Sequence, residues 1–191
     1  MKGKELMELL EAFAPKQYAC SWDNVGLLVG RSDQEVKKVL VALDATNEVV
    51  DRAVEEGVDM IITHHPVLFS SIKAINDQDF MGRKLLKLME NQIACFAMHT
   101  NFDVIGMADL AGSYLGFPED ARPLEVTVEE EDRVEGIGRV STLPEPMNLG
   151  QYAEFVKKAL KLEHVLLFGK EEKQVSKVAI SPGSGRSMVK E

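Results

Sequence analysis

The sequence is poor in cysteine and lacks a long apolar run, and both features narrow the class of protein. Its two cysteines, Cys20 and Cys95, lie 75 positions apart and form no CxxC pair. This pattern is typical of a cytosolic chain with two ordinary thiols, the alternatives being a disulfide or a catalytic cysteine. Cys95 lies in the apolar run IACFAM, which favours a core strand over a nucleophile.

No apolar stretch approaches the roughly 20 residues needed to cross a bilayer. Charges interrupt the N-terminal MKGKELMELLEAFAP too early for a secretory leader. We therefore expect a cytoplasmic protein without a membrane segment.

Positive charge is also scarce. The chain has 22 Lys and Arg against 31 Asp and Glu, a net charge of −9. This balance argues against broad nucleic-acid binding, which needs a basic surface. It leaves a metal site open, because carboxylates and imidazoles attract cations. The 45% hydrophobic content of the 191 residues is sufficient for a packed core and argues against disorder. No GxxxxGK[ST] phosphate loop or GxSxG elbow occurs.

Apolar strands alternate with amphipathic helices through the first part of the chain. Helices are expected at 2–14, 46–57, 79–91 and 107–115, and buried strands at 37–44, 58–63 and 93–98. The alternation predicts an α/β fold with a mostly parallel sheet and helices on both faces. We assign residues 1–116 to a first α/β half.

From residue 117 the pattern changes, and we assign 117–191 to a second half. Apolar and polar residues alternate from 124 to 143, as in strands with one wet face. The acidic run 129–132 is expected at a hairpin tip, and LPEPMNLG (143–150) breaks the pattern. A helix is expected at 149–161, followed by strands at HVLLFG (164–169) and VSKVAI (175–180).

Two polar clusters directly follow buried strands. THHP occupies 63–66, and HTNFD occupies 99–103. In open α/β sheets, ligands bind outside the carboxyl ends of parallel strands. If the two strands are neighbours, three of the four histidines and one aspartate converge there. Imidazole and carboxylate together suit zinc, iron, manganese or a similar divalent ion.

The adjacent histidines favour a two-metal arrangement. Neighbouring strand residues usually face opposite sides, so His64 and His65 would each hold one ion of a pair. Asp103 would join one ion or bridge both. His99 is close enough to be a ligand, a proton carrier or a partner that orients a ligand. The alternative is that His64 and His65 only cap a strand and bond to nearby backbone.

Other candidate residues give weaker signals. Asp23 and Asn24 are expected either in the same cleft or in a simple turn. Asp44 either reaches the cleft or caps the following helix. The GSG segment at 183–185 is compatible with an anion-binding loop but is more typical of a plain turn. His164 lies outside both clusters and is interpreted as structural.

Five segments together resemble the Nif-three-like family, also called dinuclear metal centre proteins or type-two GTP cyclohydrolase I homologues. They are WDNVGLLVG, LDAT, IITHHPVLF, HTNFD with its following glycine, and GIGRV, and the resemblance runs from about residue 5 to 188. It implies two similar α/β halves assembled into a homohexameric ring around a cavity. It also implies that His64, His65 and Asp103 are metal ligands, and that His99 lies beside two divalent ions.

The sequence departs from this family near its end. Family members continue past the GSG segment and supply a second histidine and a glutamate from a later helix, whereas this sequence ends at Glu191. We therefore expect an incomplete second half, in a fragment or a shortened member, and weakened metal binding.

The resemblance implies a metal-dependent hydrolase. A metal-bound water would attack a nucleotide or related substrate, with His99 as the catalytic proton-transfer group. The alternative is a non-enzymatic scaffold that binds metal or forms rings and interacts with protein partners.

Overall fold

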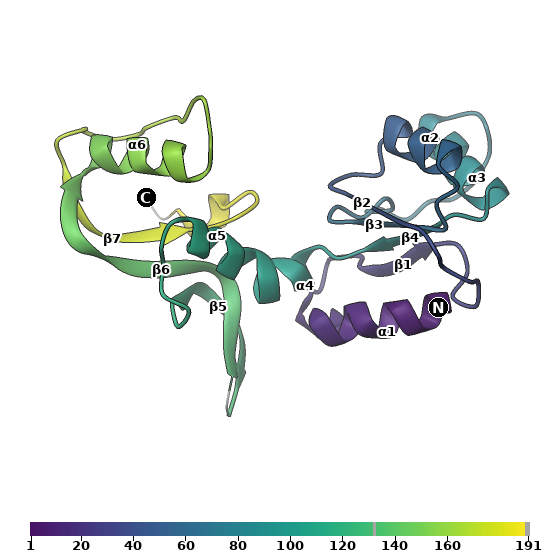
Figure 1. The fold of residues 1–191 in the computed structure, drawn as a ribbon, viewed down its shortest axis with the longest axis horizontal. Coiled ribbons are helices and arrows are strands. Elements are labelled where there is room, and N and C mark those ends of the chain that lie inside the picture. The colour runs from purple at the N-terminus through teal and green to yellow at the C-terminus, as the bar shows by residue number, and fades with distance from the viewer. Residues whose placement is uncertain (132, 190–191) are drawn as a thin grey trace. The chain divides into compact units, whose positions relative to one another are not determined.

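The computed structural model describes residues 1–131 and 133–189 and divides into two compact units (Figure 1). The first unit is Met1–Phe102 and the second is Asp103–Glu191. The division therefore falls before the helix at 107–115, which the sequence placed in the first half. Each unit is described below by itself.

The first unit contains a four-stranded, mostly parallel sheet, as predicted. Its strands are β1 (Gly26–Val29), β2 (Val39–Ala42), β3 (Met60–Thr63) and β4 (Ala94–Ala97), in the order β1-β4-β3-β2. Strands β2, β3 and β4 are parallel, and β1 runs antiparallel to β4. Gly30 has a positive φ of 96° after β1, and a Cβ there would lie 2.7 Å from the Ala94 Cα. This close approach explains the glycine that ends the GLLVG segment.

Helices lie on both faces of this sheet, also as predicted. Helices α2 (Asn47–Glu55) and α3 (Phe80–Glu90) lie on one face, and α1 (Gly3–Phe13) lies on the other (Figure 1). Short helical turns are η1 (Lys16–Tyr18) and α4 (Thr100–Phe102). The Thr46 side chain accepts from the Val49 N–H at the start of α2, and the Asp79 side chain accepts from Gly82 at the start of α3. These N-caps each contribute about 1 kcal/mol to helix stability.

The core of the first unit lies between the sheet and helices α2 and α3. Val50 and Ala53 from α2 pack with Leu85 and Leu88 from α3 against Ile61 of β3. All five are at most 2% exposed. Burial of a large aliphatic side chain contributes roughly 1.5–3 kcal/mol, so this cluster fixes the helices on the strands whose ends carry the polar motifs.

Strand β2 is an edge strand, and the prediction that 37–44 is buried is wrong. Val41 is 75% exposed and the following Leu43 is 60% exposed. Leu40 alternates with them and packs against the core. An apolar run indicates a strand but does not give its position in the sheet, and an edge strand with one uncovered face keeps half of its side chains in solvent.

The second unit has an antiparallel sheet, which differs from the predicted second half. Its strands are β5 (Arg122–Glu130), β6 (Arg133–Asn148) and β7 (Gln174–Ile180), in the order β5-β6-β7. Both strand pairs are antiparallel. The prediction of two similar α/β halves is therefore not met in the described residues. A tight hairpin joins β5 to β6, and strands joined by a tight hairpin pair antiparallel.

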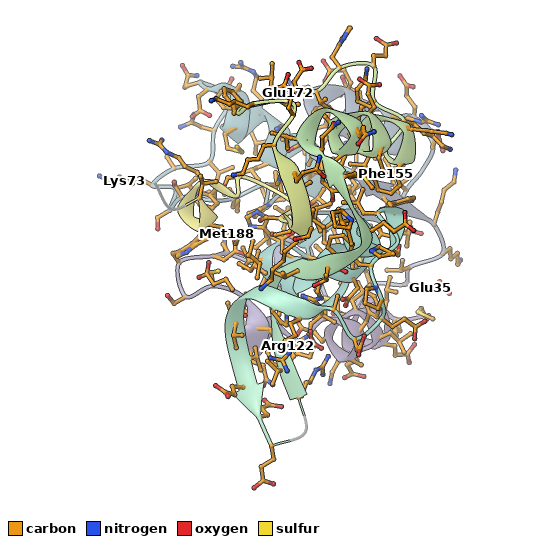
Figure 2. All side chains as sticks on the ribbon, turned by 90° about the vertical axis from the view of Figure 1, so that its left-hand side faces the viewer. Glu35, Lys73, Arg122, Phe155, Glu172 and Met188 are labelled. Carbon is orange, nitrogen blue, oxygen red and sulfur yellow. The ribbon has the colours of Figure 1, made fainter. Side chains whose placement is uncertain are left out.

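The helical segments of the second unit are η2 (Asp103–Met107), α5 (Ala108–Tyr114), α6 (Leu149–Ala159) and η3 (Arg186–Met188). Helix α6 confirms the prediction at 149–161. Figure 2 shows the side chains, with Phe155 on α6 and Arg122 at the start of β5.

Three local predictions in the second unit have different outcomes. The hairpin turns within the acidic run as predicted, since Glu130 pairs with Arg133, and Asp132 lies outside the described residues. Residues 143–148 continue β6 instead of ending it, and residues 149–150 begin α6. The two prolines of this segment lie where the register is irregular, between Thr142 and Met147. The segment 164–169 is not a strand, because it pairs with no other strand in the described residues.

None of the helices in the described part of the chain combines the length and the apolar character that a bilayer-spanning helix needs.

Cys95 lies in β4 and is fully buried, whereas Cys20 is partly exposed, and both are free thiols. Burial raises the pKa of Cys95 to about 11, even though the neighbouring Thr63 side chain and the charge of Lys84 act in the opposite direction. Only the thiolate is nucleophilic, so at pH 8 about one Cys95 in a thousand would be reactive even if reagent reached it.

We therefore expect iodoacetamide to label Cys20 of the native protein at least a hundredfold faster than Cys95, measured by mass spectrometry of tryptic peptides. Raising the pH toward 11 should increase Cys95 labelling, and labelling in denaturant should make the two rates similar. Equal rates in the native protein would contradict the buried position of β4.

Candidate metal centre

The parallel pairing of β3 and β4 brings the two polar motifs to one edge of the sheet. Thr63 and Ala97 are register partners at the ends of these strands. The Met98 N–H donates to the Thr63 carbonyl over 2.9 Å, and the His65 N–H donates to the Leu43 carbonyl over 3.0 Å. These bonds continue the ladder past both strands, so His64, His65 and His99 follow neighbouring strand ends.

The three histidines converge, as predicted. One ring nitrogen from each lies within 4.8 Å of the others. The ring centroids are 5.0 Å apart for His64 and His65, 5.1 Å for His64 and His99, and 5.6 Å for His65 and His99. The expectation that His64 and His65 face opposite sides is not met. Strand β3 ends at Thr63, so the pair lies in a bend where the strand alternation no longer applies.

Each histidine is held by an oxygen acceptor at Nδ1. His64 Nδ1 lies 3.0 Å from the Met98 carbonyl, His65 Nδ1 lies 2.8 Å from Asp44 Oδ1, and His99 Nδ1 lies 2.9 Å from Asp23 Oδ1. A carbonyl or a carboxylate only accepts, so Nδ1 carries the proton in each neutral ring. The Nε2 atoms then carry the lone pairs that bind a metal.

The Asp23 carboxylate accepts several hydrogen bonds, and its side chain is fully buried. It accepts from His99, from the Asn24 N–H, and from both the N–H and the hydroxyl of Thr100. Burial by itself pushes the pKa of Asp23 upward, but these hydrogen bonds from His99, Thr100 and Asn24 outweigh it and lower the pKa. Asp23 therefore stays ionised and fixes the ring of His99.

The structure decides between the two roles that the sequence left open for Asp23 and for Asp44. Asp44 contacts His65 and does not cap α2, because Thr46 occupies the cap. Asp23 orients His99, and the Asn24 amide donates to the Leu68 carbonyl over 2.5 Å. The sequence did not lead us to predict that Thr100 donates hydrogen bonds to Asp23. The position of Thr100 in the HTNFD segment, next to His99, could have indicated this role.

The remaining candidates lie in the second unit. Asp103 begins η2, and its role as a metal ligand stays a prediction. His164 lies in the connection between α6 and β7, outside any strand. The GSG segment precedes the short turn η3, and Gly183 and Gly185 both have positive φ, as in a plain turn.

The donor set fits a divalent transition metal. Imidazole nitrogen is a common ligand for zinc, iron and similar ions, and metal-binding histidines usually donate their other ring N–H to a carboxylate or a carbonyl. All three histidines meet this condition here.

The first unit is therefore a mostly parallel α/β sheet with an oriented histidine cluster at its carboxyl edge. The chain belongs to the Duf34/NIF3 (NGG1p interacting factor 3) family, whose model matches residues 1–191.

Relatives and solved structures agree with this assignment. The chain is 35% identical over 193 residues to the GTP cyclohydrolase 1 type 2 homolog of Clostridium acetobutylicum, covering all of this chain and 71% of that protein. The homolog from Clostridium perfringens is 34% identical over 188 residues, covering 97% of this chain and 71% of that protein. The structure of a Bacillus cereus protein related to NIF3 matches with a TM-score of 0.89 at 26% identity, covering 98% of this chain and 78% of that chain.

Replacing Asp44 with alanine removes the acceptor of His65 and leaves those of His64 and His99 in place. We expect the population of the Nδ1–H tautomer of His65 to fall, since neither ring nitrogen then has a fixed carboxylate partner. Long-range ¹H–¹⁵N NMR of the metal-free protein at about pH 8.5, where imidazoles are normally neutral, measures this directly.

The matched control is Asp33→Ala, which removes an exposed carboxylate of the same unit that pairs with Arg31. It should leave all three ring spectra unchanged. An unchanged His65 spectrum in Asp44→Ala would show that Asp44 does not set the tautomer.

Proposed function

We propose that the chain binds divalent metal through His64, His65 and His99. The observation that carries this proposal is the convergence of the three histidines, each with Nδ1 bonded to an oxygen acceptor. A cluster that served only to pack or to cap strands would not need ring nitrogens from three histidines within 4.8 Å of one another. Asp103 is proposed as an additional carboxylate ligand, on the resemblance of the HTNFD segment to the family motif.

The proposed reaction is hydrolysis of a nucleotide or a related substrate. A bound divalent ion supplies Lewis-acid activation of water. The two clostridial relatives are called GTP cyclohydrolase 1 type 2 homologs, and this name supports a nucleotide as the first substrate class to test. Within this chain, Asp44 and Asp23 would keep His65 and His99 in the metal-binding tautomer.

His99 has two proposed roles that one experiment separates. The sequence predicts that it is the proton-transfer group, whereas its ring centroid lies 5.1 Å from that of His64, nearly as close as the 5.0 Å of His65. If His99→Ala loses metal, His99 is a ligand. If it keeps metal and loses turnover, His99 transfers a proton.

The second candidate function is a metal-binding scaffold that interacts with protein partners or with other copies of the chain. The exposed edge strand β2 favours it, because Val41 and Leu43 are largely in solvent and, among the described residues, β2 pairs with a strand on one side alone. Such edges accept a partner strand.

Metal binding is tested by titrating the metal-free protein with Co²⁺ and recording its visible absorption. We expect saturable binding in the native sequence and, in His64→Ala and His65→Ala, a loss exceeding the roughly 10–100-fold cost of removing an outer partner. The number of Co²⁺ ions bound per chain shows whether the site holds two ions, as the family resemblance predicts, or one. His164→Ala is the matched control, and binding that survives in His65→Ala would contradict the proposal.

Activity is tested with a panel of nucleotides and phosphoesters in the presence of manganese, iron or zinc. We expect turnover that falls to background in His65→Ala and is unchanged in His164→Ala. A protein that binds metal and turns over no member of the panel would favour the scaffold instead.

A further inference from the structure

Two large aromatic side chains lie exposed beside the histidine cluster. Trp22, the only tryptophan of the chain, is 60% exposed, and Phe69 is 58% exposed. Their ring centroids are 6.0 Å apart and the planes are tilted by 57°. The Trp22 ring lies 6.2 Å from the His99 ring in an edge arrangement. The aromatic pair is therefore continuous with the proposed metal centre.

Hydrogen bonds anchor the backbone next to Trp22 and next to Phe69. Trp22 directly precedes Asp23, whose carboxylate is held by His99 and Thr100. The Cys20 N–H donates to the Thr100 hydroxyl over 2.9 Å. The Asn24 side chain donates to the carbonyl of Leu68, the neighbour of Phe69. The two segments are thus tied to each other and to the cluster.

The aromatic pair differs from a single exposed aromatic residue, because its two rings lie together beside the histidine cluster on an anchored backbone. Aromatic side chains are among the largest contributors to burial energy, and here both stay in water while the polar residues beside them are fixed. A preorganised aromatic surface loses little conformational entropy on binding.

We propose that Trp22 and Phe69 form a ring-binding subsite for the substrate of the histidine centre, with a planar heteroaromatic ring stacked on Trp22 beside His99. Stacking on aromatic side chains is the sequence-tolerant way in which proteins hold nucleobases. The aromatic pair lies directly beside the histidine cluster, so a ring stacked on Trp22 would present its substituents to the three histidines. We therefore propose a small molecule as the occupant. The assignment of this subsite to the substrate rests on the proposed function. Binding of the ring itself requires no metal.

The single tryptophan makes the test direct, because all tryptophan emission comes from Trp22. The full chain is titrated with guanosine, with adenosine and with ribose 5-phosphate, and emission is excited at the red edge of tryptophan absorption, where purines absorb little. We expect saturable quenching by both purine nucleosides and none by ribose 5-phosphate, which lacks the planar ring.

Phe69→Leu keeps an apolar side chain but removes the ring. We expect it to raise the dissociation constant for guanosine about tenfold, within the range found for loss of one aromatic contact to a base. Phe80→Leu is the matched control, since Phe80 is 62% exposed on α3 of the same unit. It should leave the constant unchanged. Trp22→Leu should abolish binding of radiolabelled guanosine in equilibrium dialysis, with circular dichroism confirming that the variant is folded.

Four results would overturn the proposal, and the first three concern ligand binding. They are the absence of saturable quenching, equal quenching by ribose 5-phosphate, and equal affinity in Phe69→Leu. Emission that changes with protein concentration alone would also overturn it, because a second copy would then cover the pair. Running the titration in His65→Ala without metal keeps this test separate from the proposed function. Ring binding that persists there while Co²⁺ binding is lost supports the subsite by itself.

Discussion

The parallel pairing of β3 with β4 is the constraint on which the candidate site depends. The two strands end in register at Thr63 and Ala97, so the histidines that follow each strand begin from neighbouring positions. Adjacent strands lie roughly 4.8 Å apart, and the ring centroids of His64 and His99 are 5.1 Å apart. The spacing of the cluster therefore follows from backbone hydrogen bonding, and the packing of α2 and α3 on Ile61 maintains it.

Asp23 connects the stability of the first unit with its chemistry. Its buried carboxylate joins the segment before β1 to the start of α4 through Thr100, and the same carboxylate orients His99. A buried charge is tolerated only when hydrogen bonds replace its water. Because those bonds come from the fold itself, a folded first unit already holds His99 in one orientation.

Much of the first unit could be predicted from sequence, whereas the partners of its side chains could not. The 3.6-residue period predicted α1, α2 and α3, and apolar runs followed by histidines predicted the convergence of His64, His65 and His99. The exposure of Val41 was missed because local pattern does not report strand order. The roles of Asp23 and Asp44 depend on residues far away in sequence. In the second unit, the run HVLLFG has the composition of a strand but lacks a partner to pair with in the described residues.

The three acceptors at Nδ1 differ in how readily point substitution can remove them. His65 relies on the half-exposed carboxylate of Asp44, and His99 relies on the buried carboxylate of Asp23. His64 relies on the main-chain carbonyl of Met98, which every amino acid would supply. The proton position of His64 is therefore shielded from side-chain mutation, while those of His65 and His99 can be tuned independently. Substitutions at Asp44 or Asp23, in evolution or by engineering, can therefore change the tautomer of His65 or His99, while the tautomer of His64 stays the same.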